Sequence, residues 1–127
     1  MVLSKNKEFK LHENFHEVFK VLAKSYEEKF LDLAKEELGK KYKVKRVAKL
    51  NKVKYFEGFP ELKEPHIYFT VDNLVVAVSF HIYSNVEMFW LIHVKNVNTG
   101  AYISKCANDL DIEKLLKNKK VKEIKNA

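Results

Sequence analysis

The 127-residue chain contains one cysteine, three glycines and two prolines. A single cysteine, Cys106, excludes an intramolecular disulfide and a zinc site built from several cysteines, and it is typical of a protein from a reducing compartment. The few glycines form no flexible linker and no glycine-rich phosphate loop. We therefore expect one domain over residues 1–127, with a flexible start at 1–10 and a basic tail at 119–127.

Long hydrophobic runs are also lacking. No apolar stretch is longer than that at 74–78, which is followed by Ser79 and is far too short to span a bilayer. The first residues lack the apolar core of a signal peptide, so we expect a cytoplasmic protein with no membrane partner. Hydrophobic residues nevertheless make up 46% of the chain, which is enough for a core and too much for a disordered protein.

Arginine is scarce, since only Arg46 among the 24 basic residues is an arginine. The net charge of +7 is concentrated in the stretch 40–54, which holds eight basic residues and no acidic one. Such a stretch is the expected footprint of a phosphate-rich partner, although lysines on a solvent-exposed strand also serve solubility alone. Because lysine lacks the bidentate fork of arginine, we expect any nucleic acid to be held by its backbone, without sequence specificity.

Spacings of three and four residues predict a long amphipathic helix that begins near Asn14 and ends before Gly39. Asn14 followed by Glu17 is typical of an N-terminal cap with its return partner, and Gly39 of a C-terminal stop. The apolar positions of this helix are Phe15, Val18, Phe19, Leu22, Tyr26, Phe30, Leu33, Ala34 and Leu38.

After Gly39 the apolar period changes to two, which predicts antiparallel strands with a bulge or turn near Asn51. A short helix from Asp109 follows the last strand. The fold class we expect is α+β, with the long helix packed on one face of a four- or five-stranded antiparallel meander sheet and a short C-terminal helix. The expected strands are 42–50, 66–71, 74–83, 87–97 and 101–105.

Two turns set the register of the central strands. We expect a two-residue turn at Asp72 and Asn73 and a three-residue loop at 84–86. With either connection, apolar residues of one strand pair with apolar residues of the next, and a shift of the register by one residue would prevent this. We expect the long helix to pack on the face that these pairs share. The pairs are Phe69 with Val76, Phe80 with Trp90, and Val78 with Ile92.

The opposite sheet face mixes aromatic and basic side chains, as in a stacking platform for single-stranded nucleic acid. We interpret the chain as a small, non-catalytic, basic binding protein without a cofactor, in which lysines contact phosphates and aromatic side chains contact bases. DNA and RNA fit equally. The candidate residues are Lys41, Lys43, Lys45, Arg46, Lys49, Tyr68, His81, Tyr83, Phe89 and Lys95.

An alternative is that this second face is covered, by the C-terminal helix or by a second subunit in a homodimer, because exposed apolar patches usually have a partner. The same face would also suit a protein-binding inhibitor or adaptor, for example one encoded by a phage or another mobile element and directed at a host nucleic-acid enzyme. Such binding would survive high salt, whereas phosphate binding would not.

A third hypothesis is a zinc hydrolase, because residues 12–16 resemble zinc-dependent peptidases in the motif H-E-x-x-H. The resemblance implies that His12 and His16 bind zinc and that Glu13 activates water. The expected helix start at Asn14 places the motif at a helix end, and Glu36 or Glu37, as a third ligand, would lie about 30 Å away. A second histidine set, on the sheet, lacks a carboxylate, so we expect neither a metal nor a catalytic centre. Its members are His66, His81 and His93.

Overall fold

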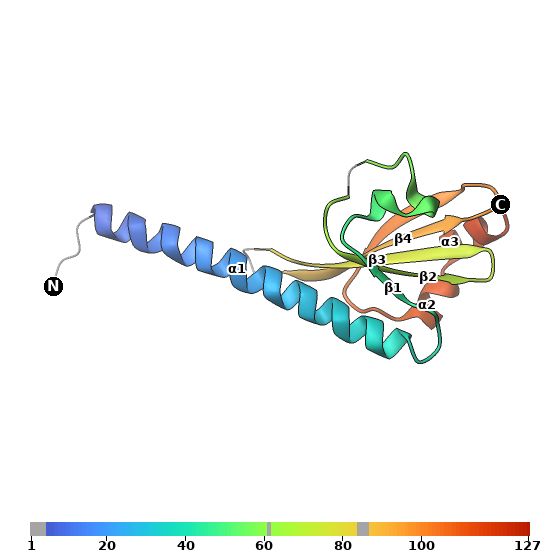
Figure 1. The fold of residues 1–127 in the computed structure, drawn as a ribbon, viewed down its shortest axis with the longest axis horizontal. Helices are drawn as coiled ribbons and strands as arrows, with labels where there is room; N and C mark the ends of the chain where they lie inside the picture. Colours follow the sequence, from blue (N-terminus) through green and yellow to red (C-terminus); the bar gives the residue numbers. More distant parts are fainter. Residues whose placement is uncertain (1–4, 61, 84–86) are drawn as a thin grey trace.

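The computed structural model describes residues 5–60, 62–83 and 87–127, with side chains from Glu17 onward. A 34-residue helix, α1 (Lys5–Leu38), precedes a five-stranded antiparallel sheet in the order β1-β2-β3-β4-β5 (Figure 1). The expected α+β fold with a meander sheet is therefore confirmed. The remaining elements are β1 (Lys45–Val47), the 3-10 turns η1 (Leu50–Lys52) and η2 (Lys54–Phe56), β2 (His66–Val71), β3 (Leu74–Ile82), β4 (Met88–Asn96), β5 (Tyr102–Ala107), α2 (Ile112–Leu116) and α3 (Lys119–Lys125).

The register of the central strands matches the prediction. Asp72 has a φ of 53°, as a tight two-residue turn requires, and the pairs on both sides of β3 are the expected ones. The predicted loop at 84–86 lies outside the described residues, but the backbone N–H of Tyr83 donates to the carbonyl of Glu87 at 2.9 Å, which fixes its two ends. The confirmed pairs are Phe69 with Val76, Phe80 with Trp90, and Val78 with Ile92.

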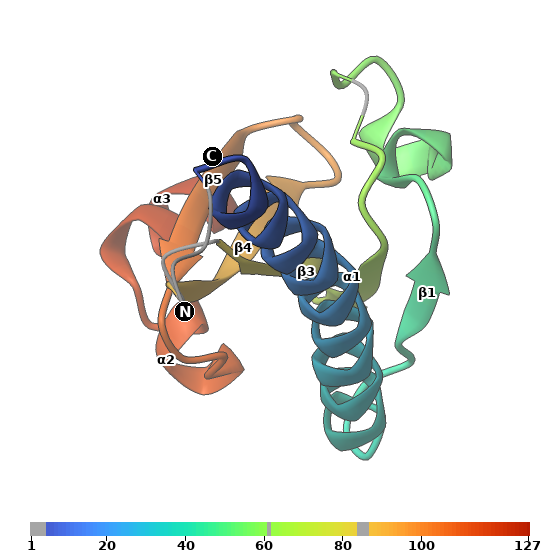
Figure 2. The same cartoon turned by 90° about the vertical axis from the view of Figure 1, so that its left-hand side faces the viewer.

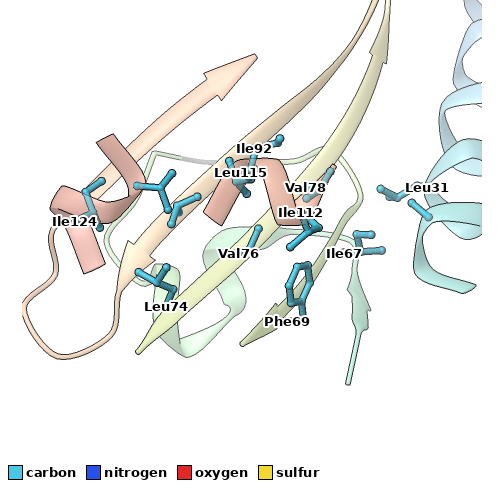
Figure 3. Close-up of a cluster of buried hydrophobic side chains, with 13 residues drawn as sticks. Leu31, Ile67, Phe69, Leu74, Val76, Val78, Ile92, Ile112, Leu115 and Ile124 are labelled. Carbon is cyan, nitrogen blue, oxygen red and sulfur yellow. The ribbon is translucent and has the colours of Figure 1, made fainter. Parts of the chain in front are cut away.

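All three helices cover the same sheet face, the one that the sequence predicted for the long helix. In the helix-side core, Leu31 of α1, Leu115 of α2 and Ile124 of α3 pack with Phe69 and Val76 of the sheet (Figure 3). The segment 119–127, expected as a basic tail, therefore contains a helix with a buried apolar side. The C-terminal helices do not cover the opposite face.

Helix α1 begins at Lys5 rather than near Asn14. Asn14 is therefore not its cap. Good helix formers, mainly lysine, glutamate and leucine, precede Asn14 and extend the helix through it. The H-E-x-x-H motif thus lies within the helix, but the side chains of His12 and His16 are outside the described part of the chain. The zinc hypothesis gains no supporting observation. The C-terminal end is where the sequence placed it, and a Cβ on Gly39 would lie 2.8 Å from the carbonyl oxygen of Lys35.

Only the C-terminal half of α1 packs on the sheet, and the N-terminal half projects beyond it (Figures 1 and 2). Ala23, Leu31 and Ala34 are buried, whereas four residues of the predicted apolar stripe are more than half exposed. The expectation that a single apolar stripe faces the core is wrong. The helix has two apolar sides, and the sheet covers only one of them. The four exposed residues are Val18, Leu22, Tyr26 and Leu33.

The predicted basic strand 42–50 is reduced to the three residues of β1. Val44 packs with the helix-side core, whereas Leu50 lies in a cluster on the opposite sheet face. The alternation that predicts a strand over 42–50 places Val44 and Leu50 on the same, inward-facing side of the sheet, and this prediction is wrong. The chain leaves the sheet after Val47 and continues through η1 and η2, so the change of phase precedes Asn51.

Candidate binding surfaces

The middle of the second sheet face is covered by the chain itself. Leu50, Val53 and Phe56, from the connection between β1 and β2, pack on Val75 and Ala77 of β3 and form the second-face cluster. All five side chains are buried. The sequence anticipated a cover but attributed it to the C-terminal helix or a second subunit. The open platform predicted for nucleic acid is therefore interrupted at its centre.

Two of the residues predicted to contact nucleic acid instead contact the connection that covers this face. The Nζ atom of Lys95 donates to the carbonyl oxygen of Tyr55 at 2.7 Å and lies 5.2 Å from the ring centroid of Phe59. Tyr68 is partly buried against the second-face cluster. Both side chains hold the connection between β1 and β2 on the sheet, so their structural role is evident.

The remaining aromatic candidates gather at one end of the sheet. The His81 and Phe89 rings stack with centroids 5.3 Å apart, and Tyr83 lies 5.3 Å from Phe89. The β2–β3 ladder ends at the pair Ile67 with Val78, so these rings stand on the part of the β3–β4 hairpin beyond β2. Tyr83 is exposed, and we name the three rings the aromatic end.

The basic candidates other than Lys95 divide into two groups. Lys41 lies 3.8 Å from the carboxylate of Glu113, and Arg46 forms an ion pair with Asp32 of α1. These two therefore bind neighbouring helices, on the helix side of the sheet. The other three, which we name the basic edge, are exposed and have no carboxylate partner among the described residues. The basic edge consists of Lys43, Lys45 and Lys49.

The basic edge and the aromatic end are separate. Lys45 is the register partner of Tyr68, which pairs with Ala77. His81 lies on β3, four residues beyond Ala77. Strand spacings of about 4.8 Å across and 3.3 Å per residue place the backbones of Lys45 and His81 roughly 16 Å apart. A ligand would have to span this distance to contact both.

A buried histidine pair lies between these two surfaces. The Nδ1 atom of His66 is 2.6 Å from the carbonyl oxygen of Glu64, so this nitrogen carries the proton and donates. The Nδ1 atom of His93 is 2.6 Å from the hydroxyl of Ser104. The two ring centroids are 5.8 Å apart, and neither Nε2 atom has a hydrogen-bond partner.

Burial dominates the titration of this pair. It lowers the pKa of His66, against the effect of the hydrogen bond to the Glu64 carbonyl. Burial, reinforced by the charges of His66 and His81, lowers the pKa of His93 to about 4. The pair is neutral at neutral pH. Within the described part of the chain, no three His, Cys, Asp or Glu side chains are placed to hold a metal ion.

Sequence reasoning missed a groove along α1 between Phe19 and Leu38. One cavity of about 340 Å³ lies between α1 and the β3–β4 hairpin, and a neighbouring one of about 440 Å³ lies between α1 and β4. Phe30 lines both, and we name the pair the α1 groove. The sequence contains a sign of this second apolar side. At 100° per residue, the nine apolar positions of the helix spread over roughly 200° of its circumference, which is much wider than the stripe that packs on one neighbour.

Comparison of the chain with protein-family models, with curated proteins and with solved structures gives no match. Among the described residues, no helix is both long and apolar enough to cross a membrane.

Proposed function

We propose that this protein is a non-catalytic binding protein that associates with the phosphate backbone of nucleic acid through the basic edge. The observation that supports this most is the exposure of Lys43, Lys45 and Lys49, in the edge strand β1 and directly before and after it, without a carboxylate partner among the described residues. A point charge on a flexible stem suits phosphate and carries no base specificity. In this proposal the protein acts in the cytoplasm.

The basic edge extends along the chain. Lys52 and Lys54, in η1 and η2, are also exposed, and the whole stretch 40–54 contains no acidic residue. Each phosphate contact releases condensed counterions, so several lysines together make the affinity fall steeply with salt. The aromatic end would supply base stacking only to a strand long enough to reach it from the basic edge.

The proposal is tested by fluorescence anisotropy with labelled single- and double-stranded DNA and RNA, at low and at physiological salt. We expect micromolar or tighter binding at low salt that weakens steeply as salt is added, with little dependence on sequence. A preference for single strands would show that the aromatic end takes part. Absence of binding at low salt would contradict the proposal and would leave the lysines as a solubility feature.

A second candidate function is binding of a protein partner, as an inhibitor or adaptor. The exposed apolar side of α1 favours it, because apolar patches of this kind usually mark interaction sites. This binding would use a different surface from the basic edge. It would persist at salt concentrations that release nucleic acid, so one salt titration separates the two functions.

A further inference from the structure

The second apolar side of α1 is only partly covered by its own sheet. Leu22, Tyr26 and Leu33 lie on it, and Phe30 stands at its border with the groove. At 3.6 residues per turn this side is turned by roughly 120° from the side that carries Leu31 and Ala34. We name it the outer stripe, and its described members are Val18, Leu22, Tyr26, Phe30 and Leu33.

The α1 groove runs along the outer stripe and gives it a second wall. Ile82 and Met88, from the β3–β4 hairpin, line one end, and Trp90 lines the other. On the helix the groove extends from Phe19 to Leu38, which is about 28 Å at 1.5 Å per residue. An apolar helix of about five turns would therefore be enclosed by α1 on one side and by the sheet on the other.

The charges along the groove indicate what fits it. Glu37 and Asp109 line the end of the groove between α1 and β4, and their carboxylates make that end acidic. Residues 5–24, the projecting half of α1, hold five lysines and three glutamates. A second copy of α1 running in the opposite direction would bring its basic half to this acidic end.

The spacing of the outer stripe also suits an antiparallel copy. In such a pair a two-fold axis at Leu22 places Val18 opposite Tyr26, and it brings sequence position 11, a leucine, opposite Leu33. Lys7 then falls opposite Glu37, whose side chain lines the groove.

We propose that two copies of this chain pair through their outer stripes in antiparallel orientation, with the projecting half of each α1 lying in the α1 groove of the other. This arrangement buries the exposed apolar side of a helix that is about 50 Å long. It also places the two sheets at opposite ends of the helix pair. The surface is distinct from the basic edge, so the pairing does not depend on the proposed function.

The first test is the molar mass in solution, measured by sedimentation equilibrium from about 1 to 100 µM, since typical dimer dissociation constants fall in or below this range. We expect twice the chain mass of 15.0 kDa for the wild-type protein. Leu22→Glu should give the monomer mass, whereas its neighbour Val21→Glu, which is more exposed and lies off the stripe, should remain dimeric. Tyr26→Glu provides a second disruptive variant, and circular dichroism checks that each variant is folded.

The second test is orientation. In a Cys106→Ser background, chains carrying Val18→Cys are mixed with chains carrying Tyr26→Cys and oxidised. The antiparallel pair should give disulfides between the two different chains, whereas a parallel pair would give disulfides between like chains. A monomeric wild-type protein at 100 µM, a dimer that survives Leu22→Glu, or a predominance of like-chain disulfides would overturn the proposal. A monomer would direct attention to a different protein as the occupant of the groove.

Discussion

His66 and His93 lie with their ring centroids 5.8 Å apart, and the Nε2 atom of each is buried without a hydrogen-bond partner. The two residues are 1% and 4% exposed. A proton on either ring would therefore carry its charge into a site that water hardly reaches, next to a second imidazole. The sheet thus contains a pair of histidines that are stable only while neutral.

The first prediction is a loss of stability in mild acid. The pKa of His93 is about 4 in the folded protein and near 6.5 in the unfolded chain, so only the unfolded chain takes up this proton between those values. The free energy of unfolding should be highest above about pH 6.5 and should fall by on the order of 3 kcal/mol toward pH 4. Urea denaturation at several pH values measures this.

The control for that prediction is His93→Gln, which keeps a polar side chain and removes the titrating group. Its free energy of unfolding should vary less with pH than that of the wild type. NMR titration of the imidazole protons gives an independent readout. A His93 that titrates near pH 6.5 in the folded protein would contradict the burial account.

The second prediction concerns the cover on the second sheet face. Phe56 is fully buried and its ring lies 5.4 Å from that of Phe59. Phe56→Ala should lower the free energy of unfolding by about 3 to 5 kcal/mol, because it leaves a cavity over β3. Glu57→Ala, at an exposed neighbour, should change it by less than about 0.5 kcal/mol. Equal, small effects in chemical denaturation would mean that the segment does not pack on the sheet.

The third prediction concerns Asn96, which ties the β4–β5 turn to the end of α3. Its Nδ2 atom donates to the carbonyl of Ile124 at 3.0 Å, and its Oδ1 accepts from the backbone N–H groups of Asn98 and Thr99 at 2.9 and 3.2 Å. Asn96→Ala should lower the free energy of unfolding by about 2 to 3 kcal/mol, because the Ile124 carbonyl and the N–H groups of Asn98 and Thr99 lose their partners.

Asn98→Ala serves as the matched control, since that side chain is exposed and should contribute little. Thermal unfolding of both variants provides the comparison. If the two variants melt together, the hydrogen bonds of Asn96 do not hold α3 to the sheet.

The sequence was most informative where two constraints coincided. The turns at Asp72 and at 84–86 independently placed the same apolar residues on one face, and the register follows from that agreement. Helix α1 was predicted less well, because periodicity shows which positions are apolar but not which of two apolar sides a sheet will cover. Leu31 is buried and Leu33 exposed, although both are leucines of one helix.

The candidate site was predicted in part. Exposure of Lys43, Lys45 and Lys49 agrees with the expected basic strand, but alternation could not show that the chain leaves the sheet after Val47. Leu50 was consequently assigned to the wrong face. The hydrogen bond from Lys95 to the Tyr55 carbonyl joins residues that are 40 positions apart in the sequence. A local sequence pattern cannot predict such a long-range contact.

The central claim is that the basic edge binds phosphate, and a charge-reversal titration tests it most directly. Lys43, Lys45 and Lys49 are changed together to Glu, and in a control protein Lys117, Lys119 and Lys120 are changed to Glu. All six side chains are exposed, and both variants lower the net charge from +7 by the same amount. Anisotropy with labelled nucleic acid should show binding abolished in the first variant and largely retained in the second, with both proteins folded. Equal affinities of the two variants would contradict the account.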